Sequence, residues 1–339
     1  MALTEETSSP LFKLGEVLGE DWPNLRKAFA ETQTVVNELG QLLSAKASAD
    51  SSIVVTGSIG RKEYTQSSDL DWYLLVDGAA DARDQKTFLT VEQLISGVDR
   101  FKKGPGKEGT FGKLVFSQPI IHLIGGEEDS NKNTTRRILL LLEAIAIGES
   151  RAFDRVRKGI LRRYLDEDKG LFRKDHIGNT RWVPLFLLND LTRYWRTIAV
   201  DFAYKQFDRG NKGYSLRSVK LGTSRKLMFA SGLLACFWCD PQISKIDGQE
   251  KQVQGLIDNL DEYLTRTPLE RIALFFNAHL DSRDASFLKR NASAMFSAYD
   301  QFIELLNENE SRDRLERLQE GKRNLTPRSN EQGHQKTIW

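Results

Sequence analysis

The stretch VTGSIGRKEYTQSSDLDWYLL, residues 55–75, contains the pattern that decides the fold. The β-branched run at residues 52–56 predicts a short strand. That strand ends at Gly57 and Ser58, a pair of small residues that lets backbone N–H groups approach a ligand closely. Residues 70–76 predict a second strand, which ends at an Asp-Gly turn. The two strands and the glycine turn between them therefore predict a small sheet with a ligand-binding edge.

Two carboxylates lie at the start of the second strand. Because alternate side chains of a strand share a face, Asp69 and Asp71 are expected to project together, with Leu70 and Trp72 on the opposite face. Paired hard oxygen ligands that leave positions for water and phosphate oxygens suit Mg²⁺ or Mn²⁺. The alternative is an ordinary turn followed by the solvated face of a strand. The agreement of strand, turn, spacing and second strand favours a metal site.

The same segment resembles the signature of the polymerase-β-like nucleotidyltransferase superfamily, a Gly-Ser pair followed by Asp-x-Asp on the next strand. The resemblance implies that Gly57 and Ser58 hold a triphosphate and that Asp69 and Asp71 ligate metal. The motif GSIGR…SDLDW is similar to the motifs of bacterial enzymes that make signalling nucleotides or oligonucleotides in anti-phage defence, and more distantly to those of nucleotidyltransferase toxins. The close resemblance covers residues 52–76.

Two further residues of the motif are candidates for the phosphates. Arg61 and Ser68 can assist nucleotide binding, but helix packing for one and a turn hydrogen bond for the other explain them equally well. Both interpretations stay open on sequence grounds.

The family normally adds a third carboxylate from a neighbouring strand, and this chain does not place it cleanly. The expected third strand, residues 113–124, contains no acid, although His122 lies near its end. We favour Asp129, in a polar turn, as the general base. The alternative is that Asp129 or Ser130 caps a helix that begins near Thr134. Acids near the ends of this strand also include Glu108, Glu127 and Glu128.

The later half of the chain carries basic residues on helical patterns. Those assigned to nucleotide binding are Arg196, Lys220 and Lys226, near Arg193, Arg217 and Arg225. Tyr194 and Trp195 are candidates for base stacking. The alternative is that Asp190 and Asp201 pair with these cations and that the aromatic side chains belong to the core.

Composition excludes several other classes of protein. The 49 Lys and Arg nearly balance the 47 Asp and Glu, so the formal charge of +2 gives no global attraction to nucleic acid or membrane. No apolar run approaches the roughly 20 residues that span a bilayer, and the N-terminal residues do not form a signal peptide. We expect a cytoplasmic protein without a membrane partner. Cys236 and Cys239 lack a second ligand pair for zinc and are expected to be free thiols.

The pattern predicts an α/β plus α architecture, in which a small mixed β-sheet nucleotidyltransferase core is followed by a helical C-terminal domain. One or two helices precede the sheet between residues 11 and 43, and residues 86–102 predict another. Residues 139–147 are expected to open the helical half. The expected divisions are a catalytic domain at 1–150, a helical substrate-binding domain at 151–306, and a charged, disordered tail at 307–339.

The function expected from this pattern is metal-dependent transfer of a nucleoside monophosphate from an NTP or dNTP, ATP among them, to a hydroxyl acceptor, with release of pyrophosphate. The resemblance implies a cyclic or linear oligonucleotide signal in anti-phage defence. Open alternatives are toxin-like transfer to RNA or protein and a catalytically inactive nucleotide-binding scaffold. Expected partners are nucleoside triphosphates, an oligonucleotide product or RNA acceptor, and an effector or activator protein.

Overall fold

The computed structural model of the chain describes residues 8–101, 112–166, 183–209, 213–238, 249–308 and 310–311. Its centre is a four-stranded mixed sheet with the order β3-β2-β1-β4. β1 is antiparallel to β2 and β4, and β2 is parallel to β3. The strands are β1 (Ser51–Val55), β2 (Trp72–Val76), β3 (Leu114–Phe116) and β4 (Ile145–Ile147). The two strands expected around the Gly-Ser pair are therefore neighbours in the sheet.

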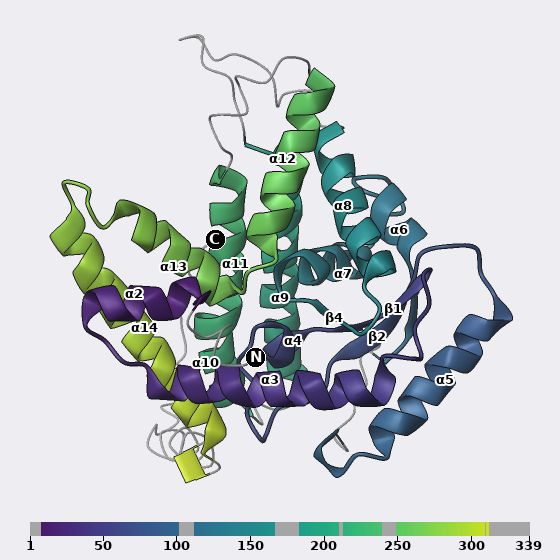
Figure 1. Cartoon of the computed structure of the whole chain (residues 1–339), viewed down its shortest axis with the longest axis horizontal. Helices are drawn as coiled ribbons and strands as arrows, with labels where there is room; N and C mark the ends of the chain where they lie inside the picture. Colours follow the sequence, from purple (N-terminus) through teal and green to yellow (C-terminus); the bar gives the residue numbers. More distant parts are fainter. Residues whose placement is uncertain are drawn as a thin grey trace, which may run out of the picture.

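Helices cover both faces of this sheet (Figure 1). Because side chains alternate along β1, Ile53 and Val55 pack with α3 and α5, while Val54 points to the core shared with α7 and α8. The short elements η1 and α6 lie on either side of β3 in the chain. The bounds are α3 (Pro23–Leu43), α5 (Ala82–Ser96), η1 (Asp99–Phe101), α6 (Ser117–His122), α7 (Asn131–Leu142) and α8 (Arg151–Asp166).

The second half of the described chain is helical, which confirms the predicted fold class. Three of these helices, α9, α11 and α12, share a core with α7, α8 and one face of the sheet. Between α9 and α11 the chain forms α10 and a single π-helical turn, η2. The bounds are α9 (Leu185–Asp208), α10 (Tyr214–Lys220), η2 (Leu221–Arg225), α11 (Lys226–Phe237), α12 (Gln249–Leu264), α13 (Pro268–His279) and α14 (Ala285–Asn307).

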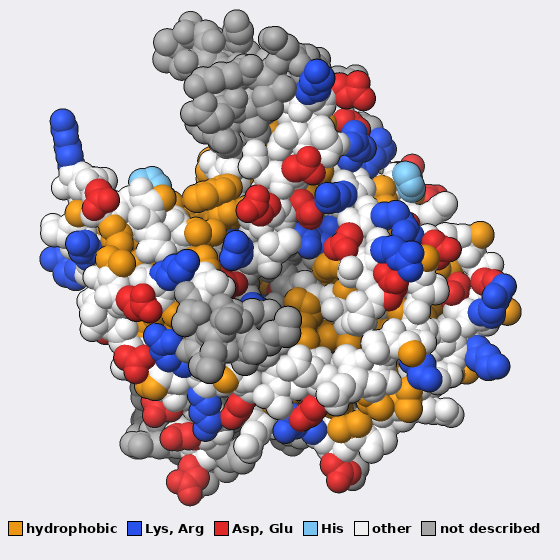
Figure 2. Space-filling model, viewed as in Figure 1, with side chains coloured by type: hydrophobic (Ala, Val, Ile, Leu, Met, Phe, Trp, Pro, Cys, Tyr) orange, Lys and Arg blue, Asp and Glu red, His pale blue; other side chains and the backbone are white. Residues whose placement is uncertain are grey.

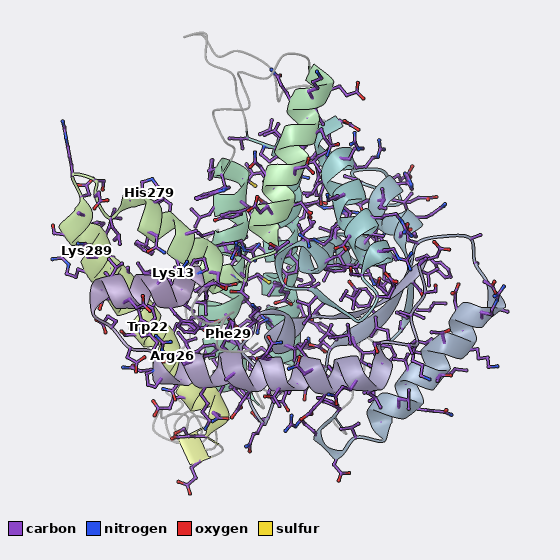
Figure 3. All side chains as sticks on the ribbon, in the orientation of Figure 1. Lys13, Trp22, Arg26, Phe29, His279 and Lys289 are labelled. Atoms are coloured by element: carbon purple, nitrogen blue, oxygen red, sulfur yellow. The ribbon has the colours of Figure 1, made fainter. Side chains whose placement is uncertain are left out.

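The first helices of the chain pack against the last ones. α2 (Pro10–Leu18) and the start of α3 share a core with α13 and α14. Trp22 packs against Phe296 of α14 in a tilted arrangement with ring centroids 5.0 Å apart, and the Arg26 guanidinium lies 4.5 Å from the centre of the Phe12 ring. Figure 3 labels Trp22 and Arg26, with Phe29, in this region. Contacts between the two ends of the described chain therefore help to fix α3 beneath the sheet.

The structure corrects two of the predicted elements. The strand expected at residues 113–124 is only three residues long and gives way to α6 at Ser117. Pro119 lies in the first turn of α6, where its missing N–H has no helical acceptor to lose. The helix expected at 139–147 ends at Leu142, and Ile145–Ile147 forms β4 beside β1. A short apolar run does not distinguish a buried strand from a buried helix by its periodicity.

Three other expectations concern the two cysteines, the C-terminal tail and membrane-spanning helices. Cys236 is buried, as expected, and Cys239 lies outside the described residues. The tail from 312 to 339 also lies outside them. Within the described part of the chain, none of the helices has the length and apolar character needed to cross a membrane.

Candidate functional site

The turn after β1 brings the Gly-Ser pair against the second carboxylate. The Thr56 N–H donates to the Asp71 carbonyl at 2.9 Å, which extends the pairing of β1 with β2 by one residue. Gly57 follows with φ +70° and opens the short helix α4 (Gly57–Gly60), where Ser58 is half-buried. A Cβ at residue 57 would lie 3.1 Å from Asp71 Oδ2. The left-handed backbone conformation therefore favours glycine here, and a side chain at this position would also crowd the Asp71 carboxylate.

The two carboxylates lie just before β2 and alternate with buried apolar side chains. Leu70 and Trp72 are buried, whereas Asp71 is half-buried and Asp69 is exposed. Burial and the nearby negative charges of Glu143 and Asp69 raise the pKa of Asp71 to about 6, against the opposing charges of Arg61 and Lys220. The site therefore holds more negative charge than its own cations compensate.

Sequence reasoning missed Glu143, which lies between α7 and β4. Its Oε1 accepts a hydrogen bond from the Gly57 N–H at 3.3 Å. Gly60 packs directly on the backbone of this residue, because a Cβ at position 60 would lie only 1.7 Å from the Glu143 carbonyl oxygen. The single available signal was the glycine at position 60, which marks a close backbone approach without identifying its partner.

Arg61 joins two carboxylates in the interior of the site. Its Nε donates to Glu63 Oε2 at 2.8 Å and its Nη1 donates to Glu143. Burial lowers the pKa of the Arg61 guanidinium, but the charges of Glu63 and Glu143 outweigh this effect and raise it. The Tyr299 hydroxyl of α14 donates to the other oxygen of Glu63 at 2.8 Å. Arg61 thus organises the site through carboxylates and links it to α14.

Ser68 makes the turn hydrogen bond that was the alternative to phosphate binding. Its Oγ accepts from the Thr65 N–H at 3.1 Å, before the chain reaches Asp69. The neighbouring Ser67 hydroxyl donates to the Leu306 carbonyl of α14 at 3.0 Å. These contacts fix the loop between α4 and β2, so Ser68 positions the Asp-x-Asp segment.

Asp129 lies in a different environment from the one expected for a general base. It is 8% exposed, and its oxygens accept from Arg137 at 2.9 and 2.8 Å and from Arg193 at 2.7 Å. Burial alone would raise the pKa of Asp129, but these hydrogen bonds lower it. Ser130 caps α7 by accepting from the Asn133 N–H at 3.2 Å. We therefore assign Asp129 to an ion-pair network within the protein.

The basic residues expected at the nucleotide divide into two groups. Lys220, at the end of α10, lies close enough to Asp71 for its charge to lower the pKa of that carboxyl. Arg196 and Lys226 are exposed on α9 and α11. Tyr194 is buried in the core, and Trp195 is half-buried and stacks on Phe229 with ring centroids 5.2 Å apart, so both rings already pack within the protein. The predicted stacking surface therefore does not consist of these two side chains.

Asp69 and Asp71 are the two carboxylates that could hold a divalent cation. In the described part of the chain, no cluster of three or more His, Cys, Asp or Glu side chains is arranged to hold a metal ion. Asp69 and Asp71 supply hard oxygen ligands with uncompensated charge, and phosphate oxygens and water usually complete such a Mg²⁺ site. Figure 2 shows a recess near the middle of the visible face, close to the position of α4 and β4 in Figure 1.

Comparison with protein families agrees with this geometry. Residues 24–98 match the model of a family described as "Putative nucleotidyltransferase DUF294". The chain carries a nucleotidyltransferase-like region. The match runs from α3 to the end of α5, so it includes the Gly-Ser pair and both aspartates but not Glu143. It supports a transferase that acts on nucleotides. Searches of the curated proteins and of the solved structures found no match to this chain.

Proposed function

We propose that this protein transfers a nucleoside monophosphate from a nucleoside triphosphate to a hydroxyl acceptor, with Mg²⁺ or Mn²⁺ bound by Asp69 and Asp71. The observation that carries the proposal is the excess of negative charge beside the glycine turn. Asp71 is half-buried next to Gly57, and burial together with Glu143 and Asp69 raises its pKa to about 6. Strongly shifted carboxylates are common at catalytic sites, where a bound cation offsets the charge.

The residues around the carboxylates have complementary roles in binding the triphosphate. Small residues at Gly57 and Ser58 allow backbone N–H groups to approach phosphate oxygens. Lys220, whose charge already acts on Asp71, supplies a cation for the same phosphates. The bound metal ion would neutralise charge on the phosphates and lower the pKa of the attacking hydroxyl.

The transfer step forms a bond between the acceptor oxygen and the α-phosphorus, and breaks the bond between the α-phosphorus and the oxygen that leaves with pyrophosphate. The acceptor hydroxyl must lose its proton. We assign this proton to Glu143 in place of Asp129. Both carboxylates have an arginine partner, so position decides between them: Glu143 lies beside Gly57 and Asp71, whereas Asp129 belongs to a separate cluster. Arg61 and the Gly57 N–H hold the Glu143 carboxylate in one orientation.

The product that we propose is a short cyclic or linear oligonucleotide used as a signal in anti-phage defence. This finer assignment rests on the resemblance of residues 52–76 to bacterial enzymes of that kind. The family match supports nucleotidyl transfer and does not extend to the product.

The test is to incubate the purified protein with each labelled nucleoside triphosphate and Mg²⁺ or Mn²⁺, and to separate the products by chromatography. Asp69→Ala is the inactive variant, and Glu92→Ala, an exposed acid on α5, is the matched control. We expect a new species that resists phosphatase, forms with wild type and Glu92→Ala, and is lost with Asp69→Ala. Equal product from Asp69→Ala would refute the metal assignment.

A further inference from the structure

Positive charge is concentrated in one segment of the chain. Residues 185–226, which include α9, α10 and η2, contain nine Lys and Arg against three Asp, a net charge of +6. Because the whole chain carries only +2, the remaining residues together carry −4. A basic segment in an otherwise slightly acidic protein points to a polyanionic ligand for that segment.

This segment folds as a helical hairpin that leads to the candidate site. Phe202 of α9 and Tyr214 of α10 pack with ring centroids 5.5 Å apart, which holds the two helices together near the connection between them. Away from that connection, Glu143 acts electrostatically on Tyr194 in the first half of α9, and Lys220, the last residue of α10, acts on Asp71. Both helices therefore run from a remote end toward the carboxylates.

The remote part of α9 exposes a row of large apolar side chains. Val200, Tyr204 and Phe207 are 69%, 63% and 85% exposed, whereas aromatic side chains on helices are usually buried. Their spacing of four and three residues places them on one face, and Arg196 precedes them by one turn on the same face. From Tyr194 to Phe207 the helix extends about 20 Å at 1.5 Å per residue.

Exposed aromatic rings on a helix whose segment carries a net charge of +6 have the chemistry of a single-stranded nucleic acid site. Rings stack on unpaired bases, and Lys and Arg pair with the phosphates. A duplex would not offer its base faces to Tyr204 and Phe207. A surface for another protein would account for the apolar row but not for the charge of +6 in this segment. The net charge of +6 already counts the three acids of α9, two of which are paired: Asp190 with Arg137 and Arg193, and Asp201 with Lys205.

We propose that the exposed face of α9 binds a single-stranded nucleic acid whose 3′ end reaches Asp69 and Asp71 as the acceptor. This inference rests on the proposed function for the acceptor role, but not for binding. It moves the predicted stacking surface from Tyr194, which is buried, and Trp195, which is half-buried and stacks on Phe229, to Tyr204 and Phe207.

The test is fluorescence anisotropy with a labelled single-stranded RNA of about 12 nucleotides, within the usual site size for such surfaces, without triphosphate or metal. We expect Tyr204→Ala/Phe207→Ala to weaken binding about tenfold or more, since stacking on each ring contributes measurably. Phe287→Ala, at a 56% exposed position on α14, is the matched control and should leave binding unchanged.

Arg196→Gln should reduce the salt dependence of log K by about 0.7, the value for one phosphate contact on a single strand. Arg83→Gln, at an 89% exposed position on α5, should leave this salt dependence unchanged.

Several results would overturn the inference. One is that Tyr204→Ala/Phe207→Ala binds the single strand as tightly as wild type, and another is that duplex RNA binds as tightly as the single strand. A third is that wild type forms a dimer and the double variant does not, because this face would then be a protein interface. A single-stranded DNA of the same sequence tells whether the sugar is recognised. Product formation from triphosphates by a protein that binds no strand would reject this inference alone. Strand binding through α9 without any transfer would reject the proposed function alone.

Discussion

Two clusters of aspartates and arginines in this protein contrast in how their charge is compensated. In the first, Arg137 is fully buried and donates to Asp129 and Asp190, and Arg193 donates to the same two acids. In the second, Asp71 lies near Asp69 and Glu143 with Lys220 and Arg61 as the nearby cations. The same residue types occur in both, so residue type alone does not identify the functional cluster.

The pKa shifts of the two clusters run in opposite directions. For Asp129 the hydrogen bonds from Arg137 and Arg193 outweigh burial and lower the pKa. For Asp71 burial and the neighbouring acids raise the pKa to about 6. A cluster that satisfies itself stabilises the fold, and a cluster with excess charge is prepared for a cation and a substrate. The comparison therefore assigns structure to the first cluster and chemistry to the second.

The largest expected effect on stability comes from Arg137→Met. The substitution leaves Asp129 and Asp190 buried without their main cation, which typically costs about 3–5 kcal/mol of the free energy of unfolding. Urea denaturation of this variant beside Arg83→Met, an exposed arginine, measures the difference. A loss below about 1 kcal/mol, the level of a surface pair, would mean that the network is not structural.

Asp71→Asn is expected to stabilise the protein. The pKa of Asp71 rises from 3.8 to about 6 on folding, so the folded state binds the proton more tightly and loses stability as pH rises between these values. At pH 7 the charged carboxylate costs up to about 3 kcal/mol, at about 1.4 kcal/mol per unit. The variant should gain that amount at pH 7 and almost nothing below pH 4. Thermal unfolding across this pH range tests the sign, and a less stable variant at pH 7 would contradict it.

A smaller effect is expected from Arg193→Gln, because this side chain is 27% exposed and Arg137 remains as the main partner of Asp129. The loss of its two hydrogen bonds to Asp129 should cost about 1–2 kcal/mol in stability. Nucleotide transfer by the folded variant should change by less than about twofold, because the arginine does not bind the substrate in this account. A larger loss of transfer at unchanged stability would instead place Arg193 at the phosphates.

The sequence contains enough information to locate the Gly-Ser turn and the paired aspartates. Strand periodicity places Leu70 and Trp72 in the core and turns Asp69 and Asp71 away from them, as the structure shows. These features are local, since Gly57 and Asp71 are fourteen residues apart, one just after β1 and the other just before its neighbour β2.

The remaining parts of the site depend on contacts between distant residues. Glu143 reaches Gly57 only because the three residues of β4 pair with β1, and so short an apolar run resembles the end of the preceding helix. In the sequence, Asp129 appeared to be available as a general base, because Arg193, one of its partners, comes from α9, far along the chain. Neither pairing leaves a periodic signal in the sequence.

The most direct test of the contrast measures nucleotide transfer by Asp71→Asn and Asp129→Asn in the same assay, at a temperature where both are folded. We expect Asp71→Asn to be the more stable protein and to lose activity by about a thousandfold or more, because removing a metal ligand costs several kcal/mol of transition-state stabilisation. We expect Asp129→Asn to be less stable and to keep its activity within about threefold. Full activity in Asp71→Asn, or an equal loss in folded Asp129→Asn, would contradict the assignment of chemistry to the first aspartate and structure to the second.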